Sequence, residues 1–248
     1  MNDWFTWNGV KCTDHHMHVL NPPSIIVPKE RAEDIEIPGK SGTLTRRQGD
    51  FIHDNINLSA TCIIDSLYDE DGRDIVFEIG RWLRGDGEVT FWNRPDGYYK
   101  GRIANQIPFD KILRNHPHRL FSLEFQCDPF FYLYSGTYEF ELGSAGRLYN
   151  LGNIPSLPLL RVEGNGEGTI MLGTETILLE DISDLDYIMI DCDAKVAYKG
   201  ERGNPNDPLM LLGSRVTGEW LSIPEGESFM TYTGGITSVI VTPRWRCV

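Results

Sequence analysis

The sequence lacks any long apolar run. Nowhere do about 18 apolar residues follow one another, which is the length that a membrane-spanning helix needs. The first residues, Met-Asn-Asp-Trp-Phe-Thr-Trp, also lack the basic start and the continuous apolar stretch of a secretory signal. We therefore expect neither a membrane span nor a secretory signal.

Positive charge is scarce, and cysteines are few and scattered. Lys and Arg total 23 against 36 Asp and Glu, so the formal net charge is −13, and no local basic stripe offsets it. Such a chain repels phosphate backbones, which argues against direct nucleic-acid recognition. The five cysteines stand at wide intervals without a Cys-x-x-Cys pair. This spacing favours reduced thiols over a disulfide framework or a zinc site.

The composition that remains is that of a globular β protein. The 248 residues are 40% hydrophobic and 11% aromatic, and at about 150 residues per domain the length favours two domains. The 25 glycines and 14 prolines separate short runs rich in Val, Ile, Thr, Tyr and Phe, which is typical of short strands. We expect a mainly β fold with domains at 1–134 and 158–248, and a Gly-, Ser- and Asn-rich linker over 135–157.

Four local patterns organise the first half. Asn8-Gly9 stands between strand-forming residues and predicts a two-residue hairpin turn, so the chain opens with a β-arm. Residues 20–50 are rich in Pro and Gly and predict an extended, loop-rich segment. Apolar residues at three- and four-residue spacing predict one α-helix near 72–84. Residues 119–127 alternate apolar and polar side chains, which predicts a strand with one wet face.

The second half contains short strand-like runs at regular spacing. They lie at 159–163, 168–172, 175–179, 187–191, 195–199 and 238–242. This spacing favours a β-sandwich of roughly 90 to 100 residues. The glycine-rich run 163–168 separates the first two of them and predicts a hairpin turn.

Catalytic and metal-binding patterns are weak. Adjacent residues of a strand point to opposite faces, so of the run 15–18 (His-His-Met-His) only His16 and His18 can converge, too few for a metal site. The aspartates between 181 and 193 do not follow the spacing of a calcium loop. The sequence holds neither a Gly-x-Ser-x-Gly elbow nor a Walker loop. We expect no enzyme, no metal and no cofactor, although paired carboxylates leave a glycoside hydrolase as an alternative.

Aromatic residues of the second half suggest a further alternative. Trp220 and Trp245 are candidates for stacking on sugar rings, which would make the second domain a carbohydrate-binding module that contributes to host-surface adhesion. Aromatic side chains of a sandwich are more often part of its core.

The order of several motifs along the chain is similar to one known family. The motifs are residues 5–9 (Phe-Thr-Trp-Asn-Gly), 33–44 (Glu-Asp-Ile-Glu-Ile-Pro-Gly-Lys-Ser-Gly-Thr-Leu), 125–131 (Phe-Gln-Cys-Asp-Pro-Phe-Phe), 150–153, 158–164, 190–198 and 241–246. Together they resemble the distal tail proteins (Dit) of long-tailed bacteriophages (siphophages and their prophages), also called phage tail component proteins. The resemblance covers nearly the whole chain.

The resemblance implies a structural virion protein made in the cytoplasm of the bacterial host. It implies an N-terminal β-rich domain that closes into a homo-hexameric ring and a C-terminal galectin-like β-sandwich. The ring is the baseplate hub that joins the tail to its tip. The implied partners are the tail tube protein, the tape-measure protein, the tail-tip hub (tail-associated lysin-like) protein and the receptor-binding protein.

The resemblance also points to residues for the protein interfaces. The candidates are Trp7, Asn8 and Gly9 in the opening arm, and Ile37, Pro38, Gly39 and Gly42 in the Pro- and Gly-rich segment. Such a segment is poorly suited to a compact core but well suited to reach across a neighbouring protomer.

Overall fold

The chain folds into two compact units in a computed structural model, which describes residues 3–47, 52–65, 73–108, 110–111, 118–143 and 145–248. The first unit comprises residues 1–131 with Val248, and the second comprises residues 132–247. The break between the units therefore lies between Phe131 and Tyr132, close to the boundary expected after residue 134. The chain is mostly β, as the sequence predicts.

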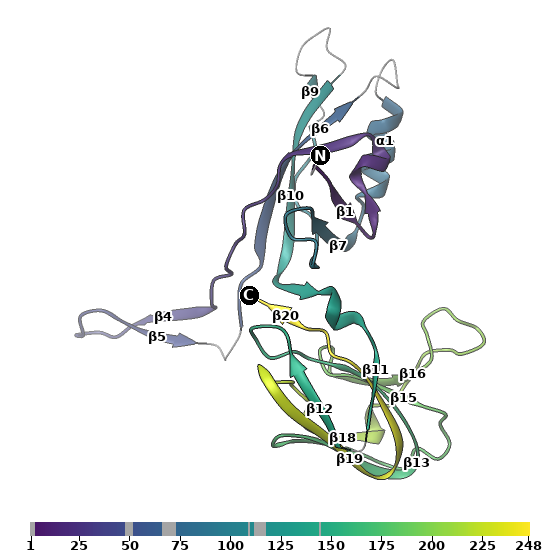
Figure 1. The fold of residues 1–248 in the computed structure, drawn as a ribbon. Coiled ribbons are helices and arrows are strands. Elements are labelled where there is room, and N and C mark those ends of the chain that lie inside the picture. The colour runs from purple at the N-terminus through teal and green to yellow at the C-terminus, as the bar shows by residue number, and fades with distance from the viewer. Residues whose placement is uncertain (1–2, 48–51, 66–72, 109, 112–117, 144) are drawn as a thin grey trace. The chain divides into compact units, whose positions relative to one another are not determined.

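The first unit is built on one antiparallel sheet (Figure 1). Its strands follow the order β2-β1-β7-β8-β10-β6-β3, and β9 also pairs with β10. Their bounds are β1 Phe5–Trp7, β2 Val10–Lys11, β3 Met17–Asn21, β6 Ile56–Asp65, β7 Asp86–Phe91, β8 Gly97–Ile103, β9 Asp110–Lys111 and β10 His118–Leu133. A 3-10 helix, η1 (Cys12–His15), links β2 to β3.

The opening hairpin forms where the Asn-Gly pair predicts it. Asn8 and Gly9 have φ angles of 50° and 79°, and β1 and β2 pair in the register Thr6↔Lys11. A two-residue turn of this kind requires positive φ at both central residues, which Asn and Gly tolerate best. The local sequence therefore favours this turn at the position where the structure has it.

Aromatic rings fill the core of the first unit. Phe121, Leu123, Phe125 and Cys127 of β10 are buried, as their alternation predicts. The ring centroid of Phe125 lies 5.5 Å from those of Phe5 and Phe91 and 5.9 Å from that of Trp7. Strands β1, β7 and β10 are thereby joined through one aromatic cluster.

The expected helix is present as α1 (Arg73–Trp82); residue 72 lies outside the described residues. Ile75 and Ile79 are buried, and Trp82 stacks on Phe5 with ring centroids 5.6 Å apart. Gly85 follows the helix with a φ of 85°, a conformation that suits glycine after a helix end. The three- and four-residue apolar spacing thus identified the face that packs on the core.

The second unit contains the strands β11–β20, all within residues 140–247. Their bounds are β11 Phe140–Leu142, β12 Ala145–Asn150, β13 Leu159–Leu172, β14 Glu175–Leu179, β15 Ile188–Asp191, β16 Val196–Lys199, β17 Met210–Leu211, β18 Val216–Gly218, β19 Gly226–Thr242 and β20 Arg246–Cys247. Two 3-10 helices, η2 (Tyr134–Thr137) and η3 (Gly213–Arg215), complete the unit.

Two long strands serve both layers of this unit. In one layer the first half of β13 pairs with the last residues of β19. This layer continues through β15, β16 and β17 beyond β13, and through β11 beyond β19. The other halves pair in the second layer with β14, β18 and β12. Apolar side chains of both layers form one core cluster. A sandwich-like architecture results, in agreement with the sequence.

The prediction of a hairpin turn at residues 163–168 is wrong. Strand β13 runs through this segment and stays paired with β19, with register shifts at Glu163/Gly164 and Gly164/Gly168. A Cβ on Gly164 would lie 2.5 Å from the carbonyl oxygen of Gly235. Gly164 and Gly168 are therefore required by the close approach of two bulged strands, and Gly166 by its φ of 101°, not by a reversal of the chain.

The segment 135–157, expected as a linker, is part of the second unit. It carries β11 and β12, both paired with β19, and it buries Leu142, Leu148 and Ile154. Its Gly, Ser and Asn residues suggested a connector, but the apolar residues between them anchor it to the core.

All five cysteines are free thiols, as their spacing predicts. Cys12, Cys62, Cys127 and Cys192 are buried, and burial raises the pKa of Cys12 to about 11 and that of Cys127 to about 12. Thiols with such pKa values stay protonated and unreactive at neutral pH.

A bidentate ion pair fixes the chain near its C-terminus. Arg244 donates from Nη1 and Nη2 to the two carboxylate oxygens of Asp191, at 2.8 and 3.0 Å. Burial raises the pKa of Asp191, but hydrogen bonds from Arg244, Ala194 and Asp193 and the charge of Arg244 outweigh it, so the pKa lies below its usual value. The charged form of Asp191 therefore stabilises the fold.

The aromatic cluster predicts a large loss of stability on truncation. Phe125→Ala should lower the free energy of unfolding by about 3–5 kcal/mol, because it removes a fully buried ring with three aromatic neighbours. Urea unfolding of the full chain measures this. Phe77→Ala is the matched control, since Phe77 is 73% exposed and should change stability by less than about 0.5 kcal/mol. Equal losses of stability in the two variants would contradict a stabilising role of the aromatic cluster.

The Asp191–Arg244 pair predicts a pH-dependent effect. Asp191→Asn should lower the free energy of unfolding by roughly 2–4 kcal/mol at pH 7, because it leaves a mostly buried guanidinium without its counter-charge. The folded-state pKa is depressed, so this stability is present above the unfolded value of about 3.9 and is lost as the pH falls through the folded value. The difference between variant and wild type should therefore shrink below about pH 4.

Candidate assembly surface

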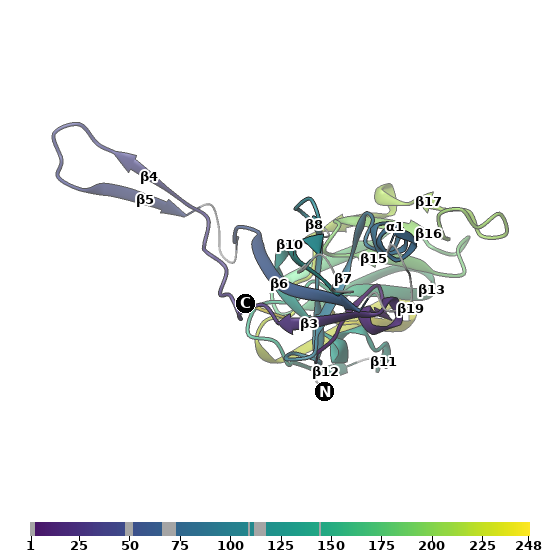
Figure 2. The same ribbon diagram turned by 90° about the horizontal axis from the view of Figure 1, so that it is seen from above.

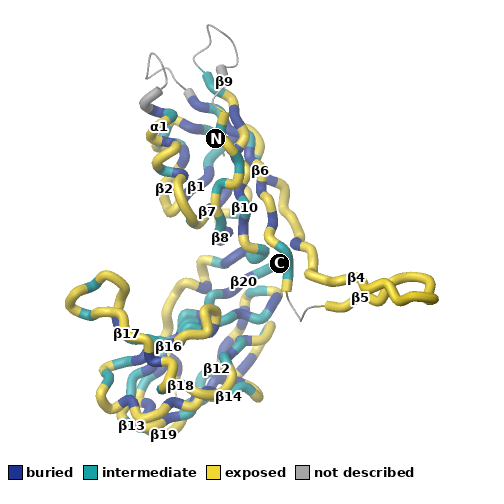
Figure 3. Tube along the Cα trace, turned by 180° about the vertical axis from the view of Figure 1, so that it is seen from behind, coloured by how far each residue is buried: buried dark blue, intermediate teal, exposed yellow. Residues whose placement is uncertain are grey.

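A projecting hairpin is the main surface feature of the first unit. It consists of β4 (Ala32–Glu36) and β5 (Thr43–Arg47), and within the described residues these two strands pair only with each other. Figures 1 and 2 show the hairpin extending away from the sheet. All ten residues of the two strands are exposed (Figure 3). The extended, loop-rich segment expected over 20–50 thus contains a regular hairpin, which we call the arm (residues 32–47).

One face of the arm carries its apolar strand residues. Ile35 and Leu44 stand opposite each other on this face, which also carries the pair Glu33 and Arg46 at its outer end. Ile37 follows directly after the end of β4. These three side chains are 37%, 50% and 39% exposed. The opposite face carries Asp34, Glu36, Thr43 and Thr45, with a hydrogen bond from Thr45 Oγ1 to Asp34 Oδ1 at 2.7 Å. Period-two alternation in Asp-Ile-Glu-Ile and Thr-Leu-Thr was the signal that could have identified these strands from the sequence.

The base of the arm is held to the chain beside it. Arg31 donates its backbone N–H to Ile52 at 2.9 Å, and its Nε lies 2.9 Å from the carboxylate of Asp54. Asp54 in turn donates its N–H to the carbonyl of Lys29 at 2.9 Å. These contacts stabilise the base of the arm. None of them involves the tip.

The predicted interface residues of the segment gather at the tip of the arm. Ile37, Pro38, Gly39 and Gly42 are all exposed, and Lys40 closes the loop by donating its N–H to the carbonyl of Ile37 at 3.1 Å. Gly39 and Gly42 both have a φ of 84°, which favours glycine. A hollow of about 440 Å³ lies within this tip, lined by Glu36, Ile37, Pro38, Lys40, Gly42 and Thr43.

The predicted interface residues of the opening hairpin, unlike those of the arm, are not all exposed. Trp7 is fully buried in the aromatic cluster, and its ring is part of the core. Asn8 is exposed, but its Oδ1 accepts the backbone N–H of Glu88 and its own N–H donates to the carbonyl of Glu88, both at 2.9 Å. Gly9 is exposed in the turn. These residues hold the opening hairpin to β7, and only Asn8 and Gly9 reach the surface.

The two tryptophans proposed for sugar stacking lie against the core of the second unit. Trp245 is 5% exposed and belongs to the core cluster, and Trp220 is partly buried against it. The ring of Trp245 is therefore not available to a sugar. The sandwich uses both rings for packing.

The histidines and aspartates singled out in the sequence have local partners. His15 stacks on Trp82 with ring centroids 4.5 Å apart, and His18 Nδ1 lies 2.8 Å from Asp3 Oδ2. Asp184 pairs with Arg215, and Asp186 pairs with Lys199 at 2.9 Å. In the part of the chain that the structure describes, no three His, Cys, Asp or Glu side chains form a group that could hold a metal ion.

No helix among the described residues is both long and apolar enough to cross a membrane.

The fold defines the class: the chain has the fold of a phage distal tail protein. It is similar to the SPP1 Dit protein, with a TM-score of 0.70 over 96% of this chain and 97% of that protein, at 15% sequence identity. A chain of the phage P2 baseplate in its activated, calcium-bound conformation is similar with a TM-score of 0.55, at 8% identity and over 96% of each chain. The resemblance drawn from the motifs is thus confirmed at the level of the fold.

No protein-family model matches the sequence, and no curated protein matches it significantly.

The hydrogen bonds of Asn8 predict a local role in stability. Asn8→Ala should lower the free energy of unfolding by roughly 1–3 kcal/mol, because it removes the acceptor for Glu88 N–H and places alanine at positive φ. Asn8→Asp keeps both the acceptor and the tolerance for this φ, so its urea midpoint should stay near that of the wild type. A neutral effect of Asn8→Ala would show that the turn does not depend on this residue.

Proposed function

We propose that the chain is a structural protein of a long-tailed phage or prophage, namely a hexameric hub at the distal end of the tail. One observation carries this proposal: the Dit fold covers nearly the entire length of both chains compared. The SPP1 Dit protein is described as a paradigm of the hub adsorption apparatus in phages that infect Gram-positive bacteria. A baseplate component is the second structural neighbour, which supports a role in the same part of the virion.

In this role the first unit forms the ring and the second unit is its galectin-like sandwich. The ring joins the tail tube to the tip, and the partners are the tail tube, tape-measure, tail-tip hub (tail-associated lysin-like) and receptor-binding proteins. The chain is made in the host cytoplasm and functions in the virion. This role is structural and requires neither catalysis nor a cofactor. A net charge of −13 suits a ring through which DNA passes, because it does not retain the nucleic acid.

The arm supports self-assembly on physical grounds. An isolated two-stranded hairpin is at best marginally stable in water, and it needs a covering surface for its apolar face. In the arm, Ile35 and Leu44 share one face, Ile37 follows directly after β4, and all three are exposed in the single chain. We propose that this face packs on a neighbouring copy, which orders the arm and links the protomers.

Carbohydrate binding through Trp220 and Trp245 has no supporting observation, since both side chains pack against the core. We therefore do not carry it further as a function.

The two faces of the arm allow a matched test of assembly. The triple change Ile35→Ser, Ile37→Ser and Leu44→Ser should abolish the six-copy species, because it removes the apolar contact. The control, Ala32→Ser, Thr43→Ser and Thr45→Ser, changes the opposite face and should assemble like the wild type. Sedimentation velocity over a concentration series, followed by negative-stain imaging, gives the number of copies.

Thermal unfolding of the monomeric species accompanies this test. Both triple variants should have the melting temperature of the wild-type monomer, because all six side chains are exposed. Deletion of residues 20–50 should also abolish the ring. A deletion variant that still forms six-copy rings would contradict the role of the arm, and a wild-type monomer at all concentrations would contradict self-assembly.

A further inference from the structure

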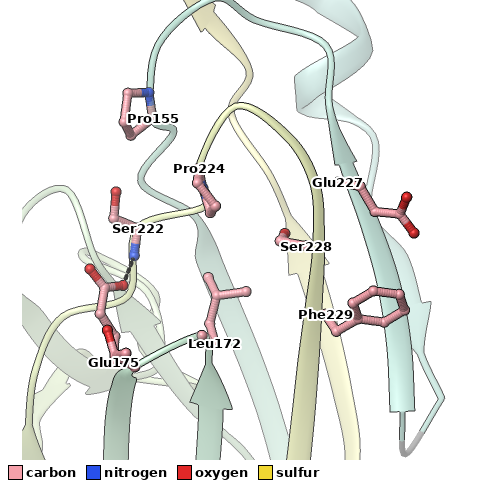
Figure 4. A pocket seen from close by; sticks show the side chains of 10 residues that line it. Pro155, Leu172, Glu175, Ser222, Pro224, Glu227, Ser228 and Phe229 are labelled. Carbon is pink, nitrogen blue, oxygen red and sulfur yellow. Dashed lines mark hydrogen bonds between the residues drawn. The ribbon is translucent and has the colours of Figure 1, made fainter.

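A cleft of about 500 Å³ lies in the second unit (Figure 4). It is bounded by the turn between β13 and β14, by the start of β19 and by the segments around residues 155 and 222–224. Its lining residues are Pro155, Leu172, Gly173, Thr174, Glu175, Ser222, Pro224, Glu227, Ser228 and Phe229. No Lys, Arg or His is among them.

Glu175 is the carboxylate of this cleft that forms no ion pair with any residue the structure describes. Its Oε2 accepts the backbone N–H of Ser222, which Figure 4 shows as a dashed line. Burial raises the pKa of Glu175 and the charge of Glu219 adds to this, while the Ser222 N–H lowers it. The other acidic lining residue, Glu227, is already paired with Arg147 at 2.6 Å. The cleft therefore has a negative potential that centres on Glu175.

Ser228 adds an unused hydrogen-bonding group. Its side chain is nine-tenths buried, and its Oγ has no hydrogen-bond partner in the structure. A buried hydroxyl without a partner costs free energy, so such a group in the lining of a cleft is a candidate to contact a ligand.

The remaining walls are apolar and narrow the choice of ligand. Leu172 lies at the floor, and Pro155 and Pro224 stand above it (Figure 4). Phe229 points away from Glu175, so no aromatic ring faces the carboxylate across the cleft as a platform for a sugar (Figure 4). One carboxylate, one free hydroxyl and aliphatic walls suit a positively charged group on an aliphatic stem.

We propose that this cleft receives a cationic side chain, lysine or arginine, of a partner protein. The charged group pairs with Glu175, and the stem lies along Leu172 and Pro224. An amide N–H of the partner's backbone donates a hydrogen bond to Ser228 Oγ, on the other side of Leu172 from Glu175 (Figure 4). This site is separate from the arm, so it holds whether or not the chain forms a ring.

Binding of small cationic probes to the full-length protein tests the proposal. The probes are Nα-acetyl-lysine methylamide and Nα-acetyl-arginine methylamide, with the uncharged norleucine analogue and methyl glycosides as comparisons. Amide NMR shifts report binding at residues 173–175, 222 and 228. We expect saturable shifts at these residues with one or both cationic probes only, and weaker binding as the salt concentration rises.

Isosteric variants identify the residues responsible. Glu175→Gln should weaken binding of the cationic probe by about tenfold or more, and Ser228→Ala should weaken it several-fold. Glu139→Gln is the matched control, because Glu139 is exposed, lies outside this cleft and should leave binding unchanged. Amide spectra of each variant verify the fold. Absence of saturable binding by both cationic probes, equal binding by the norleucine analogue, or saturable binding by a glycoside alone would overturn the proposal.

Discussion

The pairing of β13 with β19 is the constraint on which the second unit depends. Eleven residue pairs join these strands, from Leu159↔Thr242 to Leu172↔Met230, across the bulge at Gly164. Each of these strands runs through both layers. The same two strands therefore supply apolar side chains to both sides of the core. The strands that pair directly with these two, such as β12 and β15, complete the core cluster. The aromatic cluster around Phe125 has the same role in the first unit.

These two cores contrast with the surfaces that they leave without partners. Within the described part of the chain, Ile35, Ile37 and Leu44 of the arm are exposed, and Glu175 of the cleft forms no ion pair. The arm makes no contribution to either core cluster that we describe, whereas the cleft shares Leu172 with the core of the second unit. In the proposed role, the arm can therefore change its contacts without disturbing a core, and the cleft stays rigid because the core holds its floor.

Local chemistry decided which parts of the fold could be predicted from the sequence. The Asn8-Gly9 turn, the helix over Arg73–Trp82 and the alternation in β10 each depend on neighbouring residues, and all three were predicted correctly. The run at 163–168 was mistaken for a turn because its glycines serve a contact with β19, which lies about 70 residues further along the chain. The burial of Trp7 and Trp245 depends on long-range packing in the same way. The arm was predicted as part of an extended segment, but its pairing into a hairpin was missed, because Pro38 and the glycines of the tip indicated a loop and drew attention from the alternation on either side.

The glycines of the bulge have a consequence for how the second unit folds. Gly168 stands opposite Gly234, and a Cβ on Gly234 would lie 2.5 Å from the carbonyl oxygen of Glu167. Two strands of this length, far apart in sequence, must select one alignment among several when they first meet. A slip by two residues would preserve the inward and outward faces, but it would bring a side chain against the backbone at the bulge. The glycines therefore help to select the native register of β13 and β19 while the sandwich forms.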